Sequence, residues 1–404
     1  MYSDISQMEP LYPARLEGLE DLARQLVETS AKLQGSLAPA TLLGVNRLLR
    51  VVNSYYSNLI EGHDTHPIDV ERAMRQDYMN EPAKRDLQIE SVIHIEVQED
   101  TFRQLAENPT LNVTAPAFLC SLHEKFYARL PEHLRWAKGD GGQQAFVEAG
   151  KLRARYVQVG EHIPPTPESL PAFLDRFAQV YDPSRWHGLR GFVALAAAHH
   201  RLMWIHPFLD GNGRVARLFT DAYFMRYQLA GYGLWNVSRG LAREQSNYRN
   251  HLAAADAPRE GDLDGRGNLS NRTLTEFCRF FLEICLDQTR YMESVLALSG
   301  LLKRLEQYIR LREAGLIPGP AEATGPLRLE VIPALREAAI AGEVTRGEVF
   351  RLIGMSERTG RNTLKQLLTE RLLVSDAETG PVRLGFPAHA AVYWFPGLYP
   401  AESC

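Results

Sequence analysis

The sequence predicts a mainly α-helical protein with one small β-hairpin and a separate C-terminal module. Three observations lead to this prediction. Apolar residues recur at the spacing of amphipathic helices through most of residues 16–311, this period is lost over residues 139–165, and prolines and glycines crowd residues 316–326. A chain of 404 residues is long enough for two or three domains, each with its own core.

The helical period predicts a series of helices before residue 316. They are expected at residues 16–33, 41–60, 89–105, 115–130, 170–181, 189–205, 215–229 and 274–311. Over residues 139–165 glycines cluster, and the sequence Tyr156-Val157-Gln158-Val159 alternates before a double proline. This loss of the helical period predicts a β-hairpin flap within residues 139–165.

The C-terminal module is expected over residues 327–404, after a linker at residues 316–326 that holds three prolines and two glycines. Three helices are predicted at residues 330–341, 345–353 and 356–371, and the third begins at a serine that caps it. Two short strands are predicted at residues 372–375 and 382–384. This order of elements is typical of a winged helix-turn-helix domain.

A basic stripe on the third of these helices is formed by Arg358, Arg361 and Lys365, which are three and four residues apart. DNA phosphates, a protein partner or a second copy of the chain in a homodimer all fit such a stripe. The basic excess is small, six Lys or Arg against three Asp or Glu over residues 344–371. We therefore favour a protein-interaction role over DNA binding.

The composition excludes several classes of protein. A net charge of −4 and a sequence pI near 6.3 provide no chain-wide positive field for nucleic acid or anionic membranes. The longest apolar stretch, residues 191–205, is interrupted by two histidines and an arginine, so no membrane span is expected. Four cysteines without a Cys-x-x-Cys pair, together with an N-terminus unlike a secretory signal, predict reduced thiols and a cytoplasmic protein.

Residues 206–217, His-Pro-Phe-Leu-Asp-Gly-Asn-Gly-Arg-Val-Ala-Arg, predict a phosphate site. Gly211 and Gly213, on either side of Asn212, let the backbone approach an anion, and the helix that follows directs its free amides to the same place. Arg214 and Arg217 are three residues apart in its first turn. Two cations at the positive end of a helix are unfavourable unless an anion lies between them, and a di- or triphosphate supplies it.

Two further side chains of this segment predict its chemistry. Asp210 is a carboxylate beside a phosphate site, which is favourable when Mg²⁺ lies between the two anions. His206 ends the preceding helix because Pro207 prevents its continuation. An imidazole titrating near neutrality can accept a proton from an incoming hydroxyl at this position.

The whole segment is similar to the signature of the Fic family, His-x-Phe-x-Asp/Glu-Gly-Asn-Gly-Arg-x-x-Arg, at every fixed position, and the resemblance extends loosely over residues 41–311. It implies a Fic-type helical core at residues 111–315, preceded by an N-terminal helical region at residues 1–110. It also implies transfer of AMP from ATP to a Ser, Thr or Tyr hydroxyl of a protein target, which includes the chain itself.

The resemblance implies a role for each residue of the segment. His206 would be the general base and Asp210 the magnesium ligand. Residues 211–213 and Arg214 would hold the α- and β-phosphates, and Arg217 the γ-phosphate. Phe208 would anchor the loop in the core.

Two further segments have counterparts in the family. The flap would pair with the backbone of the target, and Gln158, Val159 and Gly160 are our candidates for its docking edge. Residues 238–252 follow the motif as an amphipathic helix, on which Tyr248 is our candidate for a contact to adenine.

A second motif lies upstream, at residues 57–62, where Ser57 and Glu61 fit the inhibitory pattern of the family. Glu61 is a carboxylate in the last turn of a helix at about residues 41–61, where negative charge is disfavoured. Arg217 is a cation near a helix N-terminus, where positive charge is disfavoured. We therefore expect Glu61 and Arg217 to pair in the place of the γ-phosphate. Three alternatives remain open: removal of AMP, transfer of another nucleotide or phosphoryl group, and a nucleotide-sensing DNA-binding regulator.

Overall fold

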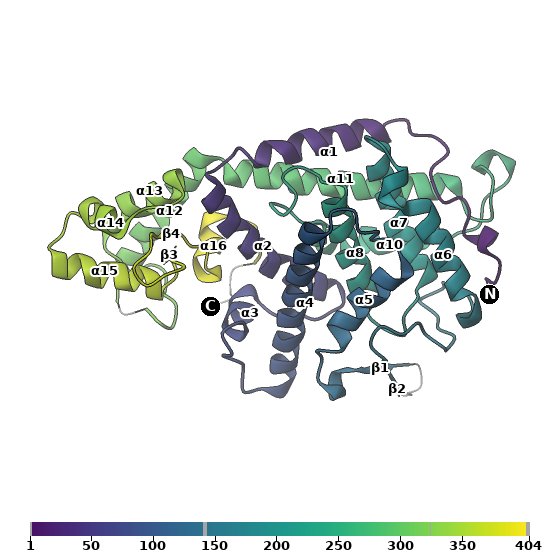
Figure 1. Ribbon diagram of the computed structural model, residues 1–404, viewed down its shortest axis with the longest axis horizontal. Coiled ribbons are helices and arrows are strands. Elements are labelled where there is room, and N and C mark those ends of the chain that lie inside the picture. The colour runs from purple at the N-terminus through teal and green to yellow at the C-terminus, as the bar shows by residue number, and fades with distance from the viewer. Residues whose placement is uncertain (1, 140–143, 324, 401–404) are drawn as a thin grey trace.

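The computed structural model describes residues 2–139, 144–323 and 325–400, and it is mainly α-helical, as predicted (Figure 1). The helices before the linker are α1 (Leu19–Leu33), α2 (Pro39–Ile60), α3 (Pro67–Ala73), α4 (Pro82–Glu107), α5 (Pro116–Tyr127), α6 (Leu170–Tyr181), α7 (Arg190–Ile205), α8 (Asn212–Arg226), α9 (Val237–Arg243), α10 (Gln245–Ala255), α11 (Asn271–Leu296) and α12 (Leu298–Glu313). Among the described residues, no helix is long and apolar enough to cross a membrane. The described cysteines are free thiols.

Helix α7 lies in the middle of the core, because all of its residues except Arg190 and Met203 are buried. It packs against α6, α8 and α11, and the long helix α11 runs beside α1 across the top of Figure 1. Helix α8 contacts α2, α4, α5 and α7. This packing brings the N-terminus of α8 close to the ends of α7 and α2, which carry the predicted histidine and glutamate.

The β-hairpin lies earlier in the chain than the strand alternation suggested. Strands β1 (Trp136–Lys138) and β2 (Gln144–Phe146) pair antiparallel, with Trp136 opposite Phe146, and residues 140–143 lie outside the described residues. Residues 156–159 form no strand; Val159 makes only an isolated bridge to His162, around a turn at Gly160 with φ of 58°. The guanidinium of Arg153 donates to the carbonyls of Arg155 and Pro165, which holds this segment as a loop.

After the linker, the elements appear in the predicted order. They are α13 (Ile332–Ala341), α14 (Arg346–Ile353), α15 (Glu357–Thr369), β3 (Leu373–Val374), β4 (Arg383–Leu384) and an unpredicted short helix, α16 (Ala388–Trp394). The Ser356 hydroxyl accepts from the Thr359 amide, as expected of the cap. The assignment as a winged helix, and the domain boundaries with it, stay predictions. The three residues of the basic stripe are exposed, but Arg361 pairs with Glu357 at 2.5 Å, which weakens its positive field.

Helix α2 also packs against the C-terminal part of the chain, which the sequence did not indicate. A Cβ at Gly44 would lie 2.8 Å from the Phe386 ring, so only glycine permits this approach. The Thr41 hydroxyl donates to Ala339 O at 3.2 Å, and the Tyr56 hydroxyl donates to Leu398 O at 3.0 Å. The helix that carries Ser57 is therefore fixed by both the core and the C-terminal part.

A buried ion pair joins the end of α15 to α12, and its loss is expected to be costly. Arg312 and Glu370 lie 2.8 Å apart with side chains 2% and 0% exposed. Glu370→Gln leaves an uncompensated buried guanidinium and should lower the free energy of unfolding by about 3–5 kcal/mol. The matched control is Glu306→Gln, since Arg310 and Glu306 are also 2.8 Å apart but 58% and 32% exposed; it should cost less than about 1 kcal/mol. Equal losses in urea denaturation would contradict this account.

Candidate active site

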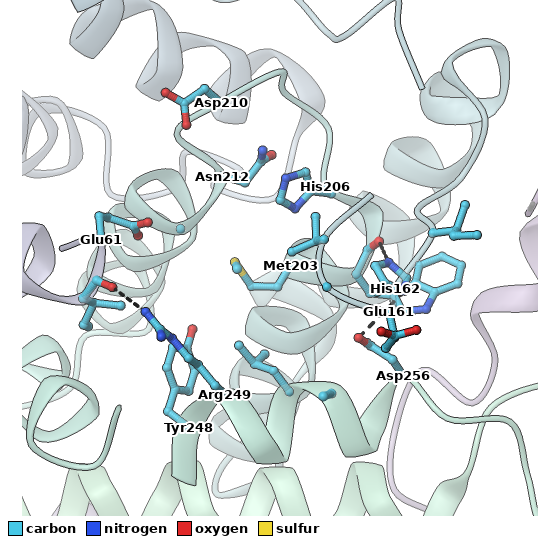
Figure 2. A pocket seen from close by; sticks show the side chains of 18 of the residues that line it. Glu61, Glu161, His162, Met203, His206, Asp210, Asn212, Tyr248, Arg249 and Asp256 are labelled. Atoms are coloured by element: carbon cyan, nitrogen blue, oxygen red, sulfur yellow. Dashed lines mark hydrogen bonds and ion pairs between the residues drawn. The ribbon is translucent and has the colours of Figure 1, made fainter. Parts of the chain in front are cut away.

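A cavity of about 910 Å³ opens at the N-terminus of α8. Its walls come from the C-terminus of α2, residues 206–217, helix α10, residues 159–163 and Tyr2. In Figure 2, His206, Asp210 and Asn212 lie at the top, Glu61 and Arg249 on the left, and His162 and Asp256 on the right. The cavity therefore brings together segments that are far apart in the sequence.

His206 is held in an unusual backbone conformation at the end of α7. It is the C-cap residue, with φ of 49° and ψ of 61°, and its amide donates to Leu202 O at 3.1 Å. Arg153, only 4% exposed, donates to the carbonyl of His206 at 2.8 Å and so fixes the turn from outside the motif. Burial, with Arg153 nearby, lowers the pKa of the His206 imidazole to about 4. The ring is therefore neutral near pH 7 and able to accept a proton.

The side chains of Phe208 and Asn212 shape the loop after His206. Asn212 accepts from the Phe208 amide and donates to the Phe208 carbonyl, both at 2.9 Å. The Phe208 ring is fully buried, as predicted, and stacks on His123 at 4.1 Å. Gly211 has φ of 79°, and a Cβ there would lie 2.7 Å from the Tyr127 ring. The side chain of Asn212 thus closes the loop, while the glycine permits its tight approach to α5.

Asp210 presents a carboxylate to the cavity, with a side chain 46% exposed. One of its oxygens accepts from the Tyr127 hydroxyl at 2.8 Å and the other from the Gly211 amide at 2.7 Å. Burial alone would raise the pKa of this carboxyl, but Arg214, Tyr127 and Gly211 together lower it below its ordinary value. Asp210 is therefore ionised, with lone pairs left for a cation.

Arg214 and Arg217 flank the anion site at the start of α8, and both are buried. Arg214 lies over the Phe126 ring at 4.8 Å and donates to the Tyr127 hydroxyl at 3.2 Å. Its Nε has no hydrogen-bond partner within the described part of the chain, and one terminal nitrogen also has none but lies 3.5 Å from the Glu90 carboxylate. Buried donors of this kind are costly unless a ligand satisfies them, and phosphate oxygens do so.

Arg217 is paired with α2, in the arrangement that the sequence predicted. Its guanidinium lies 2.5 Å from Glu61 Oε1 and donates at 2.9 Å to both the hydroxyl and the carbonyl of Ser57. Burial alone would raise the pKa of the Glu61 carboxyl, but Arg217 and Arg214 lower it. A Cβ at Gly213 would lie 2.3 Å from Glu61 Oε1, so the carboxylate rests directly on the glycine loop. Gly62, with φ of 88°, ends the helix as expected.

Tyr248, the candidate for a contact to adenine, lies in the wall of the cavity, and its contact to adenine stays a prediction. The side chain lines the cavity but is only 2% exposed, and its hydroxyl is 2.7 Å from His199 Nε2. The ring thus belongs to the wall beside Arg217, and its hydroxyl is engaged in the core.

The predicted docking edge lies at the mouth of the cavity, where Val159 and Gly160 are among the lining residues. The amide and carbonyl of Val159 are both paired with His162, so they are not open to a docked strand. The Gln158 side chain donates to Gly160 O at 2.8 Å. A docked strand would therefore have to pair with Gln158 or with the residues before it. Docking at this edge stays a prediction.

Several residues of the site had no signal in the sequence. Arg153, His123 and Tyr127 support the catalytic loop from outside the motif, as described above. At the other end of the cavity, Asp256 lies 3.3 Å from His200 Nε2 and 3.8 Å from His162 Nδ1. Residues of these types are common in any sequence. Only the tertiary structure shows that these particular ones lie together around the cavity.

Within the described ranges, no group of three or more His, Cys, Asp or Glu side chains is arranged to hold a metal ion. A single carboxylate beside an anion site is, however, the setting in which Mg²⁺ binds together with phosphate oxygens and water. Asp210 fits that role, because it is ionised and directed into the cavity.

Comparison with known proteins agrees with this site. The Fic/DOC family model matches residues 113–224. The chain is 34% identical over 143 residues to "Protein adenylyltransferase Fic" of Drosophila mojavensis, covering 35% of this chain and 27% of that protein. It is 30% identical over 198 residues to the protein of the same name from Nematostella vectensis, covering 46% of this chain and 41% of that protein. The chain thus spans less than half the length of either relative.

Solved structures show the same fold. A Fic family protein from Desulfovibrio desulfuricans G20 aligns over 92% of this chain and 98% of its own, with a TM-score of 0.53 and 18% identity. Fic-1 of C. elegans aligns over 70% of this chain and 74% of its own, with a TM-score of 0.53 and 16% identity. The family match includes the motif at residues 206–217. Residues 113–224 are therefore similar to the Fic/DOC family, and the fold of the chain is like that of these two solved Fic proteins.

Proposed function

We propose that this chain is a protein adenylyltransferase, which transfers AMP from ATP to a Ser, Thr or Tyr hydroxyl of a target protein. One observation carries the proposal: a neutral, half-buried imidazole lies in a cavity beside a candidate anion site built from a glycine loop, a helix N-terminus and two buried arginines. A proton acceptor beside a triphosphate site suits nucleotidyl transfer. The names of the curated relatives support the same activity.

In this reaction the target hydroxyl attacks the α-phosphorus while His206 accepts its proton. The bond between the α-phosphorus and its bridging oxygen breaks, and pyrophosphate leaves. The amides at the start of α8 and Arg214 stabilise the negative charge that gathers on the phosphates, and Arg217 holds the γ-phosphate. Asp256 at the far end of the cavity offers a hydrogen-bond acceptor, which suits the exocyclic amine of adenine and disfavours the carbonyl of uracil.

Asp210 would hold Mg²⁺, with phosphate oxygens and water as the remaining ligands. When bound there, the cation would neutralise phosphate charge and favour departure of pyrophosphate. The carboxylate itself is kept ionised and oriented by Tyr127 and Gly211.

We further propose that Glu61 inhibits the reaction. Its carboxylate occupies the position between Arg214, Arg217 and Gly213 that the γ-phosphate requires. ATP and Glu61 therefore compete for the same cations. The proposal includes two further contacts. The target protein also docks at Gln158, and the C-terminal module binds a protein partner.

The group that is transferred can be tested with ATP labelled at two positions. The Glu61→Gly variant, incubated with Mg²⁺ and a mixture of candidate target proteins, should transfer label from the α-phosphate to protein hydroxyls, including its own. Label in the γ-phosphate should appear only in pyrophosphate. Protein labelled from the γ-position would identify a phosphotransferase instead, and faster labelling from UTP would identify transfer of UMP.

The pH dependence of the reaction should report the lowered pKa of His206. Because the base acts in its neutral form and its pKa is about 4 instead of its ordinary 6.5, kcat/KM should stay level from about pH 8 to about pH 5 and fall only below that. Initial rates with the Glu61→Gly variant measure this, with circular dichroism at each pH to confirm folding. An acid limb centred near the ordinary value would show that another histidine is the base.

A further inference from the structure

Arg153 is a buried cation to which the proposed reaction gives no role. It is 4% exposed and is not among the residues that line the cavity, so it does not touch a substrate there. Burial lowers the pKa of its guanidinium to about 10, and the group is therefore still charged at pH 7. Its side-chain hydrogen bonds go to backbone carbonyls and not to a carboxylate. A buried cation held in this way is costly to keep, and ionisable groups with shifted pKa values gather at functional sites.

The guanidinium of Arg153 joins three backbone carbonyls. Its Nε donates to His206 O at 2.8 Å, one terminal nitrogen donates to Arg155 O at 3.1 Å, and the other donates to Pro165 O at 2.5 Å. Each nitrogen has its own acceptor, an arrangement that uses the planar fork of donors found only in arginine. In the part of the chain that the structure describes, no other hydrogen bond reaches these three carbonyls.

Two of these carbonyls are the ends of one loop, and the third belongs to the turn at His206. Residues 155–165 leave the guanidinium and return to it, and between these ends the loop brings Val159, Gly160 and His162 into the wall of the cavity. His206 has φ of 49° and ψ of 61°, a left-handed conformation that a residue with a side chain keeps only when its surroundings hold it. One side chain therefore holds both the loop at the mouth of the cavity and the turn that carries the imidazole.

We propose that Arg153 is a positioning residue, which sets the distance between the loop at residues 155–165 and the imidazole of His206. In the proposed reaction the target docks on this loop, and the imidazole accepts the proton of its hydroxyl only when the two lie within hydrogen-bond reach. The inference rests on the proposed function for the role of His206. It adds a residue outside the motif at residues 206–217, which acts on the proton acceptor and on the docked target through the same guanidinium.

The test adds Arg153→Ala to the Glu61→Gly variant, which serves as the parent. The single-turnover rate of labelling from α-labelled ATP should fall by about 10²-fold, the effect of misplacing reacting groups by about 1 Å. The affinity for ATP should stay that of the parent, because residues 210–217 are intact. The amide of Arg153, which donates to Pro207 O at 2.9 Å, is also retained in the variant. A rate that falls while ATP affinity is kept distinguishes positioning from a general loss of structure.

Two more variants complete the test. Arg153→Lys keeps the charge but replaces the planar fork by a single ammonium, so its rate should also fall, and it carries the test should the alanine variant not fold. Arg239→Ala is the matched control. Arg239 is also 4% exposed and donates to the carbonyls of Gly397 and Leu398, at 2.5 and 3.2 Å, and it is not among the residues that line the cavity. Its loss should leave the rate of labelling in the Glu61→Gly parent unchanged.

Hydrogen exchange gives a second readout that does not depend on transfer. Loss of the Arg153 guanidinium should speed exchange both at residues 155–165 and at the amides of His206 and Phe208, whereas Arg239→Ala should change neither. Exchange that quickens at only one of the two segments would overturn the inference, and so would labelling at the parent rate by either Arg153 variant or a loss of ATP affinity equal to the loss of rate. A parent that labels no protein would refute the proposed function, and the exchange result would still decide whether Arg153 couples the two segments.

Discussion

Replacement of Glu61 by glycine is expected to raise the rate of AMP transfer by about ten- to a hundredfold. The contact between Glu61 and Arg217 is a charge-assisted hydrogen bond of 2.5 Å in a cavity wall. Such a bond is worth about 1.5–3 kcal/mol, and about 1.4 kcal/mol corresponds to a factor of ten. Since ATP must displace this contact before its γ-phosphate meets Arg217, removing the carboxylate removes that cost.

The measurement is the initial rate of labelling from α-labelled ATP, for the wild type and the variant at equal concentration. The control is Glu99→Ala, which breaks an ion pair of 2.9 Å between Arg50 of α2 and α4 without touching the cavity. It should leave the rate unchanged. Equal rates for Glu61→Gly and the wild type would refute inhibition by Glu61, and no label at all from a folded Glu61→Gly variant would refute adenylyl transfer.

Replacement of His206 by alanine is expected to abolish labelling, with a loss of about 10²- to 10⁴-fold, the usual contribution of a positioned general base. The imidazole is neutral near pH 7 and is our proposed base, and Arg153 donates to the backbone carbonyl of His206. The substitution leaves residues 210–217 intact, so ATP should still bind.

Single-turnover labelling in the Glu61→Gly background gives the rate, and ATP affinity measured on the same variant shows whether binding is retained. His133→Ala serves as the control, because this histidine is 62% exposed and lies outside the cavity. A His206→Ala variant that labels at an undiminished rate would require another base. A variant that no longer binds ATP would assign His206 to the anion site.

The contacts of α2 would decide how strongly Glu61 inhibits, if the proposed inhibition holds. The helix is fixed at Gly44 and Thr41 by the C-terminal part of the chain, and at Tyr56 by Leu398. Glu61 lies at its C-terminal end, so its place in the cavity depends on these contacts as well as on Arg217. A partner bound to the C-terminal module would therefore act on the same helix that carries Glu61.

Much of the fold and of the site was predictable from the sequence because it depends on local rules. Helical periodicity located most of the helices, since side chains three and four residues apart share one face. It missed α3 and predicted a single helix over residues 274–311, where the structure has α11 and α12, separated at Ala297. The glycines at 211, 213 and 62 have the roles that backbone conformation and close approach demand. The pairing of Glu61 with Arg217 followed from two charges, each at the unfavourable end of a helix.

The tertiary structure alone decided the rest. Alternation at residues 156–159 suggested a strand. In the structure Arg153 donates to the carbonyls of Arg155 and Pro165, and the segment makes only one isolated β-bridge, between Val159 and His162. Tyr248 looked like a contact for a base, yet its hydroxyl is committed to His199, 49 residues away. Leu398 meets Tyr56 across 342 residues. The sequence by itself determined which groups form the candidate site and most of the helices, because backbone preference and charge act locally. Which side chains hold those groups in place depended on packing between distant segments, which no local pattern encodes.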